Sequence, residues 1–343
     1  MNRLEAMQAV YCYFFPEVRP IIHEVDAIVQ DDMYLVTTTA DKVRKDLEPL
    51  FDPPLDVPEN KSGYVDLDEI HVPIIERIAN VYSGLVPALG GFGYSYPTSG
   101  SSEGIFHTLA KLKVDGVDCI NVLKGEYEGY SAQAGNLKME VNEVDLNKTD
   151  ISEVDPGYWF ISNPSARDGN IIPNEFITEL CELDNKVFLD LAYAGSTRPY
   201  AFDVSHENVL GAFMSFSKPY GVFRKRIGGF AFMRGEMPTL YGNKWFKDTD
   251  RLFAALKIAE DIGPCRLYDK YRPVQKAIVD AINDEFGLGM KASDAFLLGY
   301  LKVGDAEMLS ADQLEMIADF RRDDNYRFCL TPYFEDLERK GMI

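Results

Sequence analysis

A lysine between two apolar runs is the feature of this 343-residue chain that most directly suggests chemistry. Lys218 follows the run at residues 211–214 and precedes the run at 230–233, and both runs are typical of short buried strands. An unpaired charge beside buried strands is costly, so this amine should either be paired or serve as a neutral nucleophile. A neutral amine is what imine formation with an aldehyde requires. Most lysines are solvated surface residues, so the rest of the chain must supply a site around this one.

Two more polar side chains lie at the ends of predicted strands. Asn163 follows the apolar run at 158–161, and Asp190 ends the run at 187–190. Short apolar strands that alternate with helices favour a mostly parallel sheet with helices on both faces, and ligand groups gather at the carboxyl ends of such strands. We therefore expect Asn163, Asp190 and Lys218 to share one site. Taken separately, a turn asparagine and a capping or ion-paired aspartate would explain the first two.

A segment rich in glycine and serine, residues 98–104, leads into apolar residues at helical spacing. The N-terminus of a helix offers free backbone N–H groups and the positive end of the helix dipole, which together bind phosphate. On this segment alone, ordinary N-capping by Ser101 or Ser102 is the more common arrangement.

The other predicted elements frame these residues. We expect a helical arm over about residues 1–45 and a proline-rich connection at 52–58. Further helices are predicted at 70–82, 175–183, 252–259 and 311–320 and from Pro273, where proline would occupy the first turn. Further strands are predicted at 119–123 and 295–300.

Composition limits the class of protein. The chain is 46% hydrophobic and 26% charged, as in soluble globular proteins, and its net charge of −20 argues against binding to a nucleic-acid backbone. Five scattered cysteines without a C-x-x-C pair fit reduced thiols, and four scattered histidines show no metal-ligand spacing. We find neither a signal peptide nor an apolar stretch long enough to span a membrane. We therefore expect a cytoplasmic protein without a metal site or a nucleic-acid or membrane partner.

The lysine segment resembles the motif of fold-type I pyridoxal-phosphate-dependent enzymes of the class I/II aminotransferase superfamily. That motif reads Ser-x-Ser-Lys-x-x-Gly, with an arginine eight residues after the lysine and a glycine two residues further on. The chain matches it at Ser215, Ser217, Lys218, Gly221, Arg226 and Gly228. The resemblance runs from about Tyr64 to Gly229, with a weaker similarity near Arg327.

The resemblance implies the aspartate aminotransferase fold, in which a mostly parallel sheet is flanked by helices and accompanied by a smaller α+β domain. Three parts are predicted on this basis. Residues 1–50 form an N-terminal helical arm that contributes to the small domain. Residues 51–250 form the large cofactor-binding α/β domain, and residues 251–343 form the small C-terminal α+β domain.

The catalytic residues implied by the resemblance are Lys218, Asp190 and Tyr193. Lys218 would form a Schiff base with pyridoxal 5′-phosphate and move the proton during the reaction. Asp190 would keep the pyridine nitrogen protonated, which makes the ring an electron sink, and Tyr193 would bond the phenolic oxygen of the ring. Asn163 would bond the same oxygen, although the loop after it lacks the second proline and the threonine of the family pattern Asn-Pro-x-x-Pro-Thr-Gly.

The remaining cofactor contacts follow from the same resemblance. Tyr127 matches the aromatic residue that stacks on the ring. Tyr64 matches a tyrosine that reaches the phosphate of the neighbouring subunit, which implies a homodimer with active sites at the subunit interface. Contacts to the phosphate and its surroundings are implied for Gly100, Ser101, Ser102, Ser215, Ser217 and Arg226, with Arg224 close enough in sequence to be mistaken for the last of these.

For the substrate, Arg327 resembles the arginine that clamps the α-carboxylate, because a guanidinium forms two parallel hydrogen bonds to a carboxylate. Arg321 and Arg322 just before it form a basic run of the kind that is usually solvated. Glu126 and Glu128, on either side of Tyr127, could favour a cationic substrate side chain, but we expect them to be solvated loop acids.

The predicted function is an aminotransferase that acts on an amino acid and a keto acid through the Lys218 Schiff base. A lyase, decarboxylase or cyclase of a specialised biosynthetic pathway is the alternative, because one cofactor site supports several reactions and the region after Gly229 is short for the family. A non-catalytic binding or regulatory protein on the same scaffold is disfavoured, since Lys218, Asp190 and Arg226 are all present.

Overall fold

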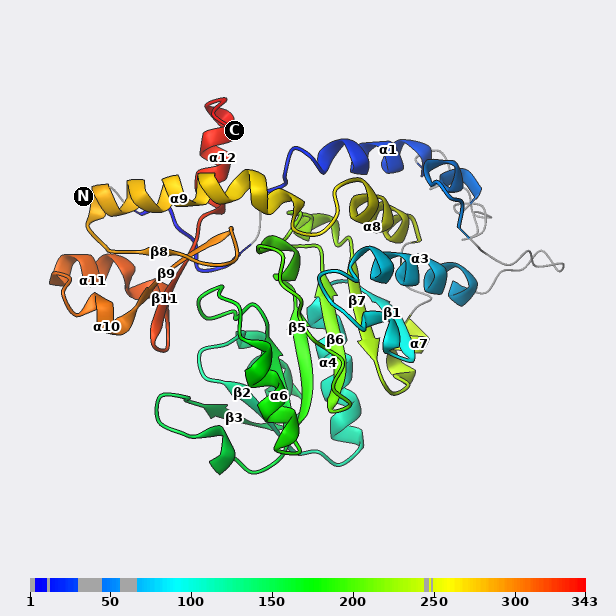
Figure 1. Ribbon diagram of the computed structural model, residues 1–343, viewed down its shortest axis with the longest axis horizontal. Coiled ribbons are helices and arrows are strands. Elements are labelled where there is room, and N and C mark those ends of the chain that lie inside the picture. The colour runs from blue at the N-terminus through cyan, green and yellow to red at the C-terminus, as the bar shows by residue number, and fades with distance from the viewer. Residues whose placement is uncertain (1–3, 11–12, 30–44, 56–66, 244–246, 248) are drawn as a thin grey trace.

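The computed structural model describes residues 4–10, 13–29, 45–55, 67–243, 247 and 249–343 (Figure 1). Its main feature is a seven-stranded sheet with the order β1-β7-β6-β5-β4-β2-β3. The strands are β1 (Tyr94–Thr98), β2 (Cys119–Leu123), β3 (Glu140–Val144), β4 (Tyr158–Ser162), β5 (Lys186–Leu191), β6 (Val209–Ser215) and β7 (Gly229–Met233). Neighbouring strands from β3 to β6 are parallel, whereas β7 pairs antiparallel with β6 and β1. The predicted mostly parallel sheet is confirmed.

Both faces of this sheet are covered because its central strands are apolar on both sides. On one face, Phe160, Phe188 and Phe213 of adjacent strands pack with α4 (Ser101–Val114) and α5 (Glu128–Asn136). The intervening strand residues, such as Ile161 and Leu189, face the larger core that includes α6 (Asn174–Glu182). That core also contains α3 (Leu67–Val81) and α8 (Thr249–Asp261), while the short α7 (Pro238–Asn243) packs beside α4 and β1.

A second sheet of four short strands lies beside the first, with the order β10-β11-β9-β8 (Figure 1). Its strands are β8 (Lys291–Ala292), β9 (Leu298–Lys302), β10 (Arg321–Arg322) and β11 (Asn325–Cys329). The long helix α9 (Arg266–Phe286) runs along it, and α10 (Val303–Ala306), α11 (Ala311–Ile317) and α12 (Thr331–Arg339) complete this part of the chain. The predicted smaller α+β unit is therefore present.

The N-terminal segment differs from the predicted helical arm. Residues 4–10 are not helical; they lie along β11, where Met7 and Cys329 exchange backbone hydrogen bonds of 3.3 and 3.0 Å. The helix of this region is α1 (Arg19–Val29), which packs on α8. Helical periodicity therefore could not predict the structure of residues 4–10, because their partner is a strand more than 300 residues away.

Two predicted helix limits are wrong. Helix α9 begins at Arg266, and Pro273 lies inside it, because buried Leu267 and Tyr271 on the preceding turns hold that segment in the core. The helix predicted at 311–320 is α-helical only to Ile317 and continues as a 3-10 turn to Phe320, and β10, β11 and the helix α12 follow it. No helix among the described residues is both long and apolar enough to cross a membrane.

Candidate active site

Predicted site residues from distant parts of the chain line a single cavity of about 330 Å³. The cavity lies at the carboxyl ends of β5 and β6, as expected for an open α/β sheet, and it extends to β10 and β11 of the small sheet. The predicted residues that line it are Gly100, Ser101, Ser102, Tyr127, Asp190, Tyr193, Ser215, Ser217, Lys218, Arg226 and Arg327.

Lys218 is placed by the turn that follows β6. The turn is held by two backbone groups: the N–H of Phe216 donates to Gly228 O over 2.7 Å, and the N–H of Ser217 donates to Ser215 Oγ over 3.2 Å. The Lys218 Nζ atom lies 3.8 Å from the centre of the Tyr193 ring. Among the described residues it forms no ion pair, so the amine is held by a ring face and remains available to a ligand.

Asp190 is buried at the end of β5, facing the cavity. Its carboxylate accepts hydrogen bonds from the N–H of Ala192 at 3.1 Å and from the Tyr130 hydroxyl at 3.5 Å. Burial raises the pKa of this carboxyl, and the nearby Lys218 charge is the strongest influence that opposes the rise. A ligand with a cationic N–H group in the cavity would pair with this buried carboxylate and stabilise its negative charge.

The start of α4 forms another wall, and the interpretation of its serines as ordinary N-caps is wrong. The N-cap is Gly100, at φ +107°, and no side chain caps the helix. Ser101 instead lines the cavity and helps to lower the pKa of Asp190, and the Ser102 hydroxyl lies 2.9 Å from the Tyr127 hydroxyl. The first N–H groups of α4 are thus left for an anion in the cavity.

Arg226 lies against this helix end. A Cβ atom on Gly100 would be 2.6 Å from Arg226 Nη2, so only glycine leaves room for the guanidinium. Partial desolvation lowers the pKa of Arg226, with Glu103 opposing the shift, and the guanidinium forms no ion pair with any described residue. Arg226 lines the cavity and Arg224 does not, so Arg226 is the arginine of this turn that faces the site.

Asn163 and Tyr64 were also predicted for this site. The Asn163 carboxamide bonds both backbone groups of Ile172, at 2.9 Å each, and the residue is not among those that line the cavity. It instead closes the loop between β4 and α6 through these two hydrogen bonds. Tyr64 lies outside the described residues.

Glu126 is not the solvated loop acid that we expected. Its side chain is buried, receives hydrogen bonds from the Ser165 hydroxyl and from the N–H of Ala166 at 2.9 Å, and lies 3.5 Å from Arg167 Nε. Burial raises its pKa to about 7, with the Arg167 charge opposing the rise most strongly. The loop that departs from the family pattern therefore packs on a buried carboxyl.

The same loop positions Arg327. The carbonyl of Ala166 accepts a hydrogen bond from Arg327 Nη1 at 2.7 Å, and Gln8 O accepts one from Nη2. The Nε atom of this buried guanidinium has no partner among the described residues, and no described carboxylate pairs with it. A carboxylate ligand in the cavity would provide one.

The sequence did not indicate two further parts of the cavity wall. Arg322, which we took for a solvated residue, lines the cavity together with Arg327, and Ala9 and Val10 of the N-terminal segment also line it. Nothing in the sequence indicated Ala9 or Val10.

Comparisons with known proteins bear on the fold. No family model and no curated protein sequence matches the chain. Among solved structures, histidinol-phosphate aminotransferase from Sinorhizobium meliloti in complex with pyridoxal-5′-phosphate is similar, with 14% identity, 99% of this chain and 92% of that chain covered and a TM-score of 0.63. An aminotransferase from Staphylococcus aureus is 13% identical, with 99% of this chain and 93% of that chain covered and a TM-score of 0.62.

A decarboxylase shares this architecture too. L-threonine-O-3-phosphate decarboxylase from Porphyromonas gingivalis is 15% identical, with 80% of this chain and 94% of that chain covered and a TM-score of 0.55. At such identities the likeness concerns the fold. The chain has the aspartate aminotransferase-like fold of the fold-type I pyridoxal-phosphate-dependent enzymes.

Proposed function

We propose that this protein is a pyridoxal-phosphate-dependent enzyme that acts on an amino acid, and specifically an aminotransferase. The observation that carries the proposal is the arrangement of one cavity. In it, the Lys218 amine, the buried Asp190 carboxylate and the Arg226 guanidinium at an uncapped helix end all face the same space. These are the groups needed for an aldehyde, a pyridinium nitrogen and a phosphate.

The residues present fit that cofactor. The N–H groups at the start of α4 and the Arg226 guanidinium, which pairs with no carboxylate of the described residues, suit a phosphate dianion, for which Gly100 leaves room. Asp190 suits a ring N–H, because its carboxylate is buried with only neutral donors and the Lys218 charge around it. The half-buried Tyr127 ring offers a flat wall, held by its bond to Ser102.

When bound, pyridoxal phosphate supplies an aldehyde that condenses with amines and a ring that withdraws electrons from the adjacent carbon. Lys218 would hold the cofactor and, once displaced by the substrate amine, would be the base that takes the proton from the substrate Cα and returns a proton. Arg327 would fix the α-carboxylate, so that the Cα–H bond points toward Lys218. Asp190 would maintain the positive charge on the ring nitrogen.

The proposal of transamination is supported by the similarity to aminotransferases and by the base and carboxylate clamp in one cavity. Decarboxylation or elimination would use the same groups, so the reaction itself must be measured. Purified holoenzyme should be mixed with single amino acids, and the amine form of the cofactor, the keto acid, carbon dioxide and ammonia should each be followed. Formation of the amine form together with a keto acid is expected. Release of carbon dioxide or ammonia without the amine form would replace transamination by the alternative reactions.

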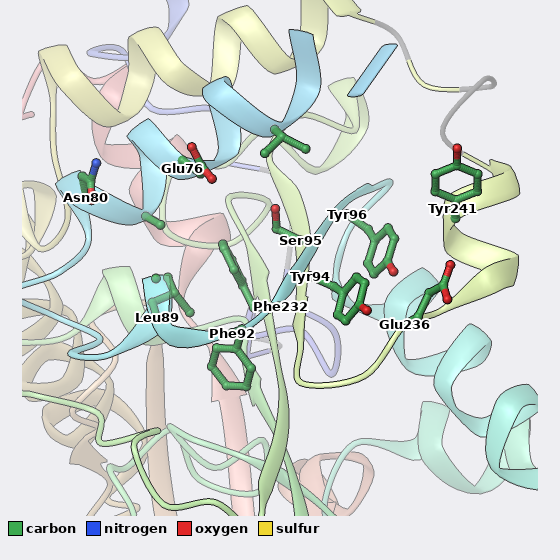
Figure 2. A pocket seen from close by; sticks show the side chains of 14 residues that line it. Glu76, Asn80, Leu89, Phe92, Tyr94, Ser95, Tyr96, Phe232, Glu236 and Tyr241 are labelled. Atoms are coloured by element: carbon green, nitrogen blue, oxygen red, sulfur yellow. The ribbon is translucent and has the colours of Figure 1, made fainter. Parts of the chain in front are cut away.

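We further propose a cytoplasmic homodimer. The support is the resemblance noted for the region around Tyr64, together with an exposed face at the edge of the large sheet. There α3, β1 and α7 enclose a second cavity of about 550 Å³ that carries aromatic side chains (Figure 2). Tyr94 and Tyr241 are 42% and 47% exposed there, and a partner subunit would cover them. Sedimentation equilibrium should show a dimer, and a monomer at micromolar concentration would contradict this part of the proposal.

A further inference from the structure

Arg322 and Arg327 form a pair of cationic side chains on the side of the cavity that belongs to the small sheet. Arg322 of β10 lies opposite Asn325 of β11, and Arg327 lies two residues further along β11. Because side chains alternate along a strand, all three lie on one face of the hairpin. Arg322 and Arg327 both reach the cavity. An α-carboxylate occupies only one guanidinium, so the second one is left to another group.

The only carboxylate bonded to Arg322 among the described residues is that of Glu128, at the start of α5. The Arg322 side chain is 19% exposed, whereas the Glu128 side chain is 73% exposed. Desolvation and the nearby Arg327 charge both lower the pKa of Arg322, so its cationic form is not fully compensated by Glu128. An ion pair with so exposed a partner is weak and can be exchanged for a ligand.

There is also room for a substrate side chain at this point. A further cavity of about 300 Å³ adjoins the first, and both are lined by Tyr127, Glu128 and Arg322. The carboxylates of Glu126, Glu143 and Asp323 also line this further cavity, so an anionic group would be held at its entrance beside Arg322 and not inside it. The ion pair thus stands where the two cavities meet. If Arg327 binds the α-carboxylate of a substrate, the substrate side chain would lie close to the Arg322 guanidinium.

We propose that the substrate is an amino acid with a second anionic group in its side chain, either a carboxylate or a phosphate, and that Arg322 binds this group in place of Glu128. The inference rests on the proposed function, since it takes Arg327 as the α-carboxylate site. A cationic substrate side chain at Glu128 is the opposite possibility. It is disfavoured because a cation there would lie beside both guanidiniums, and like charges at close range repel.

Binding of anions without an amino group tests this specificity without any turnover. Glutarate and butyrate, a dicarboxylate and a monocarboxylate of similar length, should be titrated into the holoenzyme by calorimetry. Glutarate should bind at least about tenfold more tightly, as expected for one additional charge-assisted hydrogen-bonded pair. The Arg322→Gln variant should lose this preference, whereas Arg322→Lys should keep part of it.

Two variants serve as controls. Arg224→Gln changes an exposed arginine that lines neither cavity and should leave both affinities unchanged. Glu128→Gln removes the competing carboxylate and should tighten glutarate binding. Equal affinity of wild type for glutarate and butyrate, or loss of binding in Arg224→Gln and Arg322→Gln alike, would overturn the inference.

Amino acids then distinguish the two kinds of anion. The holoenzyme should be titrated with glutamate, phosphoserine, alanine and lysine while the cofactor spectrum is recorded. A preference for glutamate indicates a carboxylate and one for phosphoserine a phosphate, and either should be lost in Arg322→Gln. If alanine or lysine is preferred, the substrate inference is wrong while the proposed function stands. If the protein binds no cofactor at all, the proposed function fails. The titration of the cofactor-free protein with glutarate and butyrate still decides whether Arg322 binds a second anionic group.

Discussion

The Lys218 Nζ atom lies 3.8 Å from the centre of the Tyr193 ring, between the end of β5 and the turn after β6. The ring face holds the amine by a cation–π contact, and no carboxylate of the described part of the chain forms an ion pair with it. Such a contact fixes the position of the amine and still lets it leave for a ligand. The Tyr193 ring and its hydroxyl therefore have separable tasks.

The first prediction concerns these two tasks. Tyr193→Phe keeps the ring under Lys218 and removes the hydroxyl, so the holoenzyme should form with a shifted absorption maximum and an activity lowered by about tenfold or more, the effect of one lost hydrogen bond to a charged group. Tyr193→Leu removes the ring as well and should also weaken retention of the cofactor. Identical spectra for wild type and Tyr193→Phe would mean that the hydroxyl does not touch the cofactor.

Asp190→Asn tests the ring nitrogen site. Asparagine keeps the size of the side chain but cannot balance a positive ring nitrogen, so the variant should bind cofactor and lose at least about a hundredfold in kcat, as seen when one preorganised electrostatic group is removed. Steady-state kinetics on the holoenzyme measures this loss. A variant with wild-type kcat would rule out Asp190 as the partner of the ring.

Gly100→Ala should weaken the phosphate site. Its Cβ atom would be 2.6 Å from Arg226 Nη2, at a backbone φ of +107° that side chains rarely adopt. We expect cofactor affinity to fall by about tenfold or more, from a cost of roughly 1–2 kcal/mol for strain and displacement of the guanidinium. Equilibrium dialysis of the cofactor is the appropriate measurement.

Gly116→Ala is a matched control for that variant. Gly116 also has a positive φ, +87°, but a Cβ atom there meets nothing within 4 Å. The two variants should lose similar stability from backbone strain, whereas only Gly100→Ala should lose cofactor affinity. Parallel losses of affinity in both would show that the effect comes from strain alone.

The positions of the main site residues could be predicted from the sequence because local signals place them. Asp190 and Lys218 follow apolar runs long enough to be strands, and parallel strands bring their carboxyl ends together. In contrast, β3 was missed because Glu140 and Glu143 make it a polar edge strand without an apolar run. Strand β1 was missed for a similar reason, since it begins with exposed Tyr94 and contains a proline.

The details that depend on distant contacts could not be predicted. Glu126 looks like a loop acid, and its burial depends on Ser165 and Ala166, about 40 residues later in the chain. Arg322 looks like part of a solvated run, and only the pairing of β10 with β11 directs it to the cavity. Sequence periodicity contains no information on either contact.

Glu126 gives a prediction on the pH dependence of stability. Its carboxyl is surrounded by the charge of Arg167, the carboxylate of Asp168 and the ring of Tyr130, and its pKa in the folded protein is about 7 instead of 4.5. Because the folded state holds this proton more tightly, the contribution to stability is complete below about pH 4.5 and is lost as the pH rises through about 7.

Glu126→Gln stays neutral and should lack that loss. As the pH rises from 4.5 to 8, the free energy of unfolding of the variant should therefore increase by a few kcal/mol relative to that of the wild type. Urea unfolding at a series of pH values measures it, and Glu128→Gln, on an exposed side chain two residues away, should not produce the same trend. A pH-independent difference for Glu126→Gln would place the carboxyl in contact with solvent.

The central claim is that Lys218 is the amine that holds pyridoxal phosphate. The purified protein should be supplied with the cofactor, reduced with borohydride, digested and analysed by mass spectrometry. The account predicts a visible absorption band that disappears on reduction and a cofactor-derived mass on the peptide that contains Lys218, with neither in Lys218→Ala. A colourless wild-type protein in excess cofactor, or the added mass on a different lysine, would contradict the account.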